Sequence, residues 1–168
     1  EGLIPSWITT HVDLNTAEEE NIQEAQIWLR RMRSKNLLTE VFAKRLHNKM
    51  FGKVWTWAGT YRTTQKNIGV ESNVITLNLI QLFHDVEYWI ANKTYVMEEI
   101  AIRFHHKLVF IHPFPNGNGR HSRLMADTLM RSLGGTPFTW GRISLTNKSE
   151  TRSDYIRALK SADNYDIK

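Results

Sequence analysis

The sequence predicts one all-α domain that spans all 168 residues. Apolar residues recur every three to four positions in six segments, which is the spacing of amphipathic helices. No internal repeat or low-complexity tract divides the chain. A chain of this length can bury roughly 70% of its unfolded surface in one core, so it needs no disulfide to be stable.

Turn residues separate the six helical segments. The first segment follows Thr16, whose spacing to Glu19 fits a capping box. The fourth stops at Pro113, and the fifth ends at Gly134 and Gly135. The expected helices cover residues 17–33, 39–50, 78–92, 95–110, 119–133 and 150–163.

One stretch, residues 60–75, lacks the helical pattern. Thr63 and Thr64 break the apolar periodicity, and Asn67 and Gly69 are typical turn residues. We expect a short β-hairpin here, and an ordinary connecting loop is the alternative.

Residues 112–123 have the sequence HPFPNGNGRHSR and lie between the fourth and fifth helices. The first N–H groups of a helix have no partner within the helix and, with the helix dipole, attract anions. Gly117 and Gly119 place no side chain between these amides and a ligand. Arg120 and Arg123 are three residues apart, so on a helix both point roughly the same way and could together hold a polyphosphate tail. The motif therefore predicts a phosphate site.

His112 directly precedes this loop. Its ordinary pKa of about 6.5 leaves the ring mostly neutral at pH 7, so it can accept a proton from an attacking hydroxyl. Each feature alone has a plainer explanation, because Asn-Gly repeats are common in turns and arginine pairs are usually solvated. Their occurrence together within one short segment favours a site. We expect His105, His106 and His121 to serve helix packing and loop hydrogen bonds.

At these residues the chain resembles the Fic (Fic/Doc) family, whose signature is HPFx[D/E]GNGRxxR. The resemblance continues upstream through residues 57–62, WAGTYR, which are similar to the segment that leads into the family's substrate-docking flap. Within the family, the chain looks closest to the bacterial group called mobile mystery protein B. The resemblance implies a mostly helical domain that transfers AMP from ATP to a Ser, Thr or Tyr hydroxyl of a target protein.

The resemblance also assigns roles to the matching positions. It makes His112 the base for the target hydroxyl, and Phe114 the residue that anchors the loop in the core. It implies that the nucleotide phosphates bind Gly117, Asn118, Gly119, Arg120 and Arg123, with the two arginines on the β and γ phosphates. The flap would align the target segment through Thr63, Thr64, Gln65, Lys66, Asn67 and Ile68.

One position does not match, since Asn116 stands where the family has the acidic residue that coordinates Mg²⁺. An amide oxygen can bind a hard cation but lacks the carboxylate charge that Mg²⁺ sites normally include. We therefore expect Asn116 to contact phosphate-bound Mg²⁺ weakly, with the nucleotide supplying most ligands.

Thr16 to Asn21 also match the family's inhibitory pattern, [S/T]xxxE[G/N]. The resemblance implies that Glu20, within a helix at 16–33, pairs with Arg123 and blocks the γ phosphate. A plain helix start is the alternative reading of the same residues. Otherwise a separate antitoxin protein would supply the glutamate, as in part of the family.

Two other functions stay open. A related enzyme could bind the nucleotide the other way round and phosphorylate its target, as Doc does. Alternatively, Asn116 could make the chain a nucleotide-binding regulator with little catalysis.

Composition limits the remaining classes. The chain has no cysteine, which suits the cytoplasm, and no apolar run long enough for a membrane span. Its 22 basic and 17 acidic residues give a net charge of +5, a mild excess that a polyanionic nucleotide partly explains. Since no nucleic-acid-binding module occurs, nucleic acid is an unlikely partner.

Overall fold

The computed structural model describes residues 1–32, 36–140, 157–159 and 161. It contains five α-helices in these residues, together with one 3₁₀ turn, η1 (Ser72–Val74). The helices are α1 (His11–Arg31), α2 (Glu40–Phe51), α3 (Ile75–Ala91), α4 (Met97–Ile111) and α5 (Asn118–Ser132). The all-α prediction is confirmed. The expected helix at 150–163 lies outside the described residues except at 157–159 and 161, which are helical.

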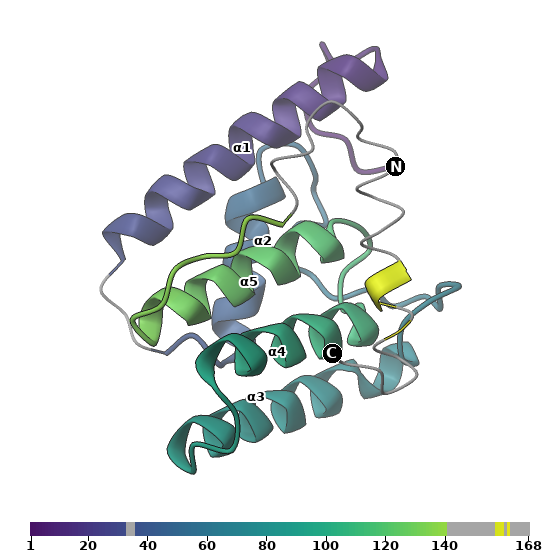
Figure 1. Cartoon of the computed structure of the whole chain (residues 1–168). Coiled ribbons are helices and arrows are strands. Elements are labelled where there is room, and N and C mark those ends of the chain that lie inside the picture. The colour runs from purple at the N-terminus through teal and green to yellow at the C-terminus, as the bar shows by residue number, and fades with distance from the viewer. Residues whose placement is uncertain (33–35, 141–156, 160, 162–168) are drawn as a thin grey trace.

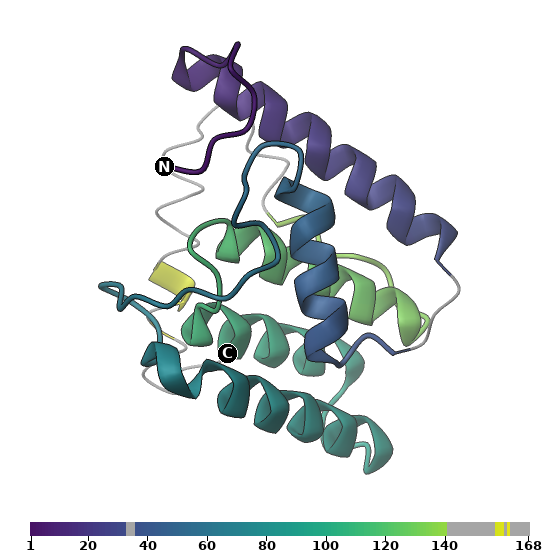
Figure 2. The same ribbon diagram turned by 180° about the vertical axis from the view of Figure 1, so that it is seen from behind.

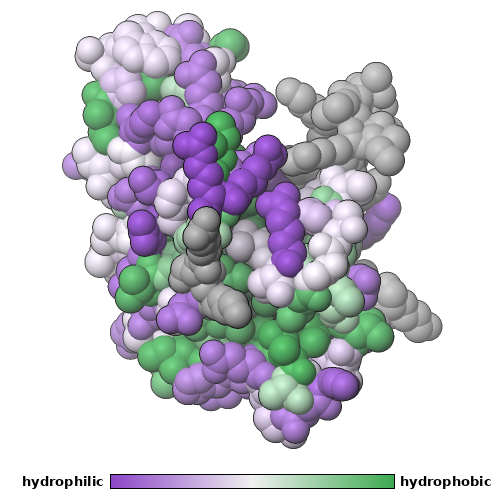
Figure 3. Space-filling view, turned by 90° about the vertical axis from the view of Figure 1, so that its left-hand side faces the viewer, coloured by the Kyte–Doolittle hydropathy of each residue, from purple (hydrophilic) through white to green (hydrophobic). Residues whose placement is uncertain are grey.

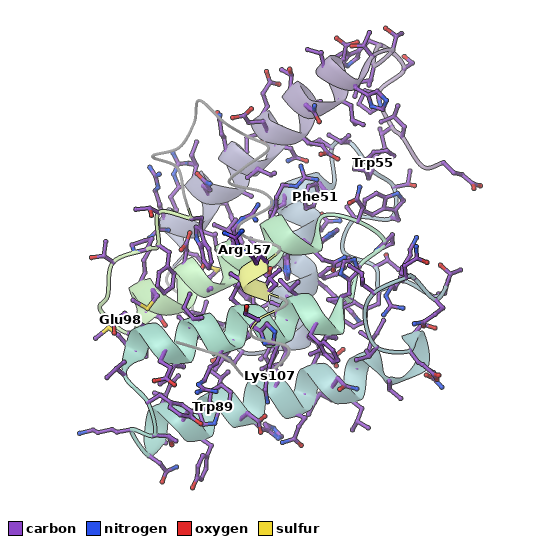
Figure 4. The ribbon with its side chains drawn as sticks, turned by 45° about the vertical axis from the view of Figure 1, so that its right-hand side comes forward. Phe51, Trp55, Trp89, Glu98, Lys107 and Arg157 are labelled. Atoms are coloured by element: carbon purple, nitrogen blue, oxygen red, sulfur yellow. The ribbon has the colours of Figure 1, made fainter. Side chains whose placement is uncertain are left out.

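The helices α3, α4 and α5 lie side by side, and α2 crosses them at a steep angle (Figures 1 and 2). The first helix, α1, packs along α2. Between α3 and α4, Lys107 places its Nζ atom 3.1 Å from an Asp85 carboxylate oxygen and 5.4 Å from the ring centre of Trp89 (Figure 4). The core thus forms where these helices meet, and its largest fully buried side chains include Phe51, Phe104 and Phe114.

Helix α1 begins six residues earlier than its predicted start. Thr10 is the N-cap, since its hydroxyl accepts a hydrogen bond from the Asp13 N–H at 3.1 Å, and the Asp13 carboxylate accepts one from the Thr10 N–H at 3.0 Å. The predicted capping box at Thr16 is wrong, because Thr16 lies within the helix and donates to the Val12 carbonyl. Two boxes occur in sequence, and no proline or glycine separates them, so the helix extends to the first.

The predicted β-hairpin at residues 60–75 is also wrong, because these residues form an irregular loop that ends in η1. A hairpin needs a ladder of backbone hydrogen bonds between its strands. Here side chains bind the carbonyls instead: the Arg62 guanidinium donates to Thr64 and Val70, and the Ser72 hydroxyl donates to Thr63.

The N-terminal segment is attached to the turn after α2. The Ile4 N–H donates to the Val54 carbonyl at 2.8 Å, and the Thr56 N–H donates to the Gly2 carbonyl at 2.9 Å. Asn21 of α1 binds the end of α2 and the same turn, since its side chain donates to the Lys49 carbonyl and accepts from the Lys53 N–H. These contacts hold α1 against α2 at two separate points.

Figure 3 shows one face of the molecule, on which polar and apolar side chains occupy different areas. Apolar side chains gather on its lower part, and Val96 and Met97 at the turn between α3 and α4 are exposed. Of the described helices, none has both the length and the apolar character needed to cross a bilayer.

Candidate active site

His112 occupies the point where α4 ends. Its backbone is left-handed, with φ 52° and ψ 58°, and its N–H still donates to the Leu108 carbonyl at 3.2 Å. A left-handed conformation is uncommon for any residue except glycine, and the following Pro113 disfavours helical geometry at this position. The chain therefore turns sharply at His112 and separates its ring from the side-chain rows of α4.

The environment of His112 favours its neutral ring. Burial lowers the pKa of His112, and the positive charges of Arg62 and Lys66 lower it further, while the Val109 carbonyl opposes both effects. The Nδ1 atom is buried and has no hydrogen bond of normal geometry among the described residues. Because the residue is half-buried, Nε2 is the nitrogen that remains accessible to a proton donor.

The loop after His112 is fixed by its own side chains. Phe114 is fully buried, which confirms its expected anchoring role. Asn118 binds both backbone groups of Phe114: its Oδ1 accepts from the Phe114 N–H at 2.9 Å, and its Nδ2 donates to the Phe114 carbonyl at 2.8 Å. The Asn118 side chain is thereby committed to the loop, so only its backbone can face a nucleotide.

His47 of α2 supports this loop from the core. Its ring stacks on Phe114 with ring centres 3.8 Å apart. The Gly59 N–H donates to Nδ1 at 3.0 Å, which leaves Nε2–H to donate to the Asn116 carbonyl at 3.0 Å. Burial lowers the pKa of His47 to about 4, so the ring stays neutral and keeps this pair of hydrogen bonds at pH 7.

The N-terminus of α5 presents backbone N–H groups that lack partners. Gly117 is the N-cap with φ 78°, and a Cβ atom there would lie 2.6 Å from the Phe51 ring, so only glycine fits. No side chain caps the helix, and among the described residues no acceptor binds the N–H groups of Asn118, Gly119 or Arg120. N–H groups at a helix start can bind an anion, and the phosphate site at these three amides stays a prediction.

Arg120 contacts a carboxylate of α1. Its Nη1 lies 2.6 Å from Oε2 of the buried Glu18, whose Oε1 accepts from the Trp55 indole N–H at 2.7 Å. The Arg120 guanidinium also lies 4.8 Å from the ring centre of Phe51. Phe51 and Trp55 therefore hold this pair between α1 and the start of α5 (Figure 4).

Arg123 lies one turn further along α5 and faces α4. Its guanidinium is close enough to His105 to lower the pKa of that buried ring, although burial itself is the main cause. The two arginines thus come from the same helix but contact different neighbours, Glu18 on one side and α4 on the other.

Glu20 is the carboxylate that the sequence pattern predicts to pair with Arg123, and this residue is exposed. Between these described residues no ion pair joins Glu20 to Arg123, whereas Glu18 pairs with Arg120. Asn21 explains the orientation, because its buried side chain binds the turn after α2 and fixes the inward face of α1. Glu20 lies about 200° around the helix from Glu18, so the two cannot face α5 together.

Asn116 does not form a magnesium site in this structure. Its Oδ1 accepts a hydrogen bond from the Gly117 N–H at 2.7 Å, which engages one of the two lone pairs of its single side-chain oxygen. In the described part of the chain, no group of three or more acidic, histidine or cysteine side chains could hold a metal ion. The residues present therefore do not fit a protein-held Mg²⁺.

The six residues expected to dock a target, 63–68, are all exposed. They lie next to His112, since Arg62 at the start of their loop donates through Nε to the His112 carbonyl at 2.7 Å. The exposed position agrees with a docking role, which stays a prediction.

Three residues of this site were missing from the sequence-based prediction. His47 sits on the apolar face of α2 between Leu46 and Met50, and a polar residue on such a face is a usable signal. Arg62 was noted only as part of the WAGTYR resemblance. Glu18 is one of three consecutive glutamates, and only the packing of α1 distinguishes them.

Comparison with known proteins identifies the family. A profile of the Fic/DOC family matches residues 37–130. The protein adenylyltransferase Fic of Drosophila grimshawi is 33% identical over 128 residues, which cover 73% of this chain and 25% of that protein. Fic-1 from Caenorhabditis elegans superposes with a TM-score of 0.67 at 24% identity, covering 95% of this chain and 46% of that one. BepC from Bartonella tribocorum, solved with bound AMPPNP, superposes with a TM-score of 0.62 at 21% identity. The match covers 76% of this chain and 71% of the BepC chain.

The chain spans about a quarter of the length of the curated relatives it matches. Its place in the mobile mystery protein B group stays a prediction. The family itself is shown by the matched profile, which includes the whole of residues 112–123, and by the identity to the adenylyltransferase relatives. The chain belongs to the Fic/DOC family.

Proposed function

We propose that this chain is a protein adenylyltransferase domain that transfers AMP from ATP to a hydroxyl side chain of a target protein. The observation that carries the proposal is the position of His112, a ring kept neutral by its surroundings, directly before the unpartnered N–H groups of α5. The adenylyltransferase relative supports the choice of AMP as the transferred group.

In this mechanism His112 Nε2 accepts the proton of the target hydroxyl as its oxygen attacks the α phosphorus of ATP. A new oxygen–phosphorus bond forms, and the bond from the α phosphorus to the pyrophosphate oxygen breaks. Negative charge grows on the departing pyrophosphate, and the amides of Asn118, Gly119 and Arg120 stabilise it together with the guanidinium groups of Arg120 and Arg123. Asn116 contributes through its bond to Gly117, which shapes the loop.

The target docks on the exposed residues 63–68 in this proposal. An extended segment can pair with exposed backbone groups of such a loop without requiring a particular sequence, although the carbonyl groups of Thr63 and Thr64 already accept from Ser72 and Arg62. A strand would then form in the complex, although the isolated loop contains none.

His112→Ala should lower transfer by a factor on the order of a hundred to ten thousand, since a general base typically contributes this much. The matched control is His84→Ala, because His84 is an exposed histidine on α3. Each protein is incubated with ATP and cell lysate, and modified proteins are weighed by mass spectrometry. If the folded His112→Ala protein transfers AMP at the parental rate, His112 is not the base.

The mass added to the target also separates the proposal from its rivals. AMP transfer adds a nucleotide, whereas a Doc-like phosphotransferase adds only a phosphoryl group. Binding of ATP without any modified product, even after the α1 carboxylates are replaced, would indicate a nucleotide-binding regulator.

The proposal includes inhibition of AMP transfer by α1, through the Glu18 carboxylate that contacts Arg120. Its ion pair with Arg120 competes with a phosphate oxygen for the same guanidinium. A carboxylate within the chain would then do what an antitoxin protein does elsewhere in the family.

Glu18→Gln should tighten ATP binding about tenfold and raise self-modification, since one charge-assisted hydrogen bond no longer competes. Glu20→Gly tests the carboxylate that the sequence pattern implied, and Glu19→Gln is an exposed control. An increase with Glu20→Gly but none with Glu18→Gln would show that Glu20 inhibits and that Glu18 only positions Arg120.

A further inference from the structure

Arg62 is buried, and its side chain and backbone N–H together donate five hydrogen bonds to carbonyl groups around His112. It is 3% exposed. Its Nε donates to the His112 carbonyl at 2.7 Å, and Nη2 donates to the Ile111 carbonyl at 3.4 Å. Nη1 donates to the Thr64 carbonyl at 3.1 Å, and Nη2 also donates to the Val70 carbonyl. Its own backbone N–H donates to the Pro113 carbonyl at 2.9 Å.

These partners belong to two separate parts of the chain. Ile111 and His112 end α4, where the last carbonyl groups have no partner within the helix and carry the negative end of its dipole. Thr64 and Val70 lie at the two ends of the loop that contains the exposed residues 63–68. One planar guanidinium, with donors in a fixed arrangement, therefore joins the end of α4 to both ends of this loop.

The cost of burying Arg62 indicates a specific role. Among the described residues no carboxylate pairs with its guanidinium, so its charge is balanced only by carbonyl dipoles. A charged group removed from water without an ion partner is expensive, and a neutral apolar residue would leave the four carbonyl groups without these donors. The arginine is therefore placed to bind both segments at once.

Gly69 brings the same loop against His112 from the other side. It has φ 100°, and a Cβ atom there would lie 2.7 Å from the His112 Cβ and 2.8 Å from Arg62 Nη2. The loop, the guanidinium and the histidine are thus in direct contact.

We propose that Arg62 is a positioning residue, which fixes the left-handed turn at His112 and holds the docking loop at a set position relative to the histidine ring. The inference rests on the proposed function, which makes His112 the base and residues 63–68 the docking surface. Through Arg62, a target segment aligned on the loop is aligned on the base as well.

The charge of Arg62 has a second, measurable effect. The groups that act on the His112 ring are the cations Arg62 and Lys66, which lower its pKa, and the Val109 carbonyl of α4, which raises it. Removing the charge at position 62 should therefore raise the pKa of His112 from its value in the parent. The acid limb of the rate against pH would then move to higher pH, because the base is protonated over a wider range.

Two arginine variants separate geometry from charge. Arg62→Lys keeps the charge but cannot bind four carbonyl groups at once, so the loop should loosen while the pKa of His112 stays near its parental value. Arg62→Gln removes the charge too, so the pKa should rise. Amide hydrogen exchange at His112 and Phe114, whose N–H groups donate to Leu108 and Asn118, measures the first effect, and NMR titration of the His112 ring in the nucleotide-free protein measures the second.

Two glycine-to-alanine variants, at Gly69 and Gly134, test the inference while Arg62 stays intact. Gly69→Ala places a methyl group against His112 and Arg62, whereas Gly134→Ala has a similar positive φ, 85°, but no atom within 4 Å of its Cβ position. Both variants carry the same kind of backbone strain. Only Gly69→Ala should accelerate exchange at residues 112–114 and lower kcat.

With the active protein, Arg62→Lys and Gly69→Ala should lower kcat about 10- to 100-fold, as expected when reacting groups are misplaced by about 1 Å. The Kd for ATP should change less than about twofold, because the amides of α5 are untouched. Arg103→Lys is the matched control, since Arg103 lies on α4 and binds Glu99.

Parental exchange rates and parental kcat in folded Arg62→Lys would overturn the inference. So would equal effects of the two glycine variants. If the parent transfers nothing from any nucleotide, the proposed function fails, but hydrogen exchange and the His112 titration still decide whether Arg62 positions the ring.

Discussion

The two loops that flank His112 are held in opposite ways. The signature loop, residues 113–117, is fixed by several independent contacts, including the Asn118 side chain, the His47 ring and the buried Phe114. The docking loop, residues 63–70, is exposed and is held mainly by Arg62. The loop proposed to bind phosphate is thus part of the core, and the loop proposed to meet a target is not.

This difference follows from what each loop must recognise. A phosphate group has one shape, so a fixed arrangement of amides stabilises it without reorganisation. A target protein varies in sequence, and an exposed loop can adapt to it while one attachment keeps it near the base. In this proposal the fixed signature loop and the adaptable docking loop both adjoin His112.

The largest contrast should appear when one polar side chain at each loop is replaced by alanine. Asn118→Ala deletes two hydrogen bonds and leaves the buried N–H and carbonyl of Phe114 unpaired, which should cost about 2–4 kcal/mol of unfolding free energy. Thr64→Ala changes an exposed side chain and should cost less than about 0.5 kcal/mol. Urea unfolding measures both values. Similar losses would contradict the distinction between the loops.

Acid should weaken the signature loop before the docking loop. Burial lowers the pKa values of His47 and His105 to about 4 and lowers that of His121 well below its usual range, so all three are neutral in the folded protein. Unfolded histidines bind protons near pH 6.5, so the unfolded state holds more protons between pH 6.5 and about 4. The stability from each ring is complete above pH 6.5 and is lost as pH falls through this window.

The expected slope is about 1.4 kcal/mol per pH unit for each histidine within that window. Urea unfolding at several pH values measures the summed loss of unfolding free energy. Hydrogen exchange at pH 5 shows which residues lose protection. The protection of the Phe114 and Gly117 N–H groups, corrected for the slower intrinsic exchange at pH 5, should fall relative to pH 7 by more than the protection at residues 63–68. A constant unfolding free energy from pH 7 to pH 5 would show that these rings are not buried as described.

The smallest effect is expected at Asn116, which is the exposed position of the signature loop. Asn116→Asp can keep the hydrogen bond to the Gly117 N–H and adds a carboxylate charge that Mg²⁺ favours. Transfer measured in a magnesium titration should rise on the order of a few-fold. An unchanged or lower rate would show that the loop geometry, rather than the missing charge, limits metal use.

Local patterns predicted much of this molecule. The periodicity placed α2 to α5 within a few residues of their ends, and glycine and proline located the junction at His112. The errors came from distant partners. Neither the guanidinium contacts that replace a hairpin nor the packing that turns Glu18 inward and Glu20 outward can be seen within a short window of sequence.

The attachment of α1 has a consequence for how Arg120 is released. Because residues 2–4 and Asn21 both bind the turn after α2, lifting the whole helix would break contacts far from the arginine. A rotation of the Glu18 side chain breaks only its own two hydrogen bonds, and such rotations are far faster than movements of a helix. Competition for Arg120 should therefore equilibrate quickly and follow the nucleotide concentration, like a reversible inhibitor carried by the protein itself.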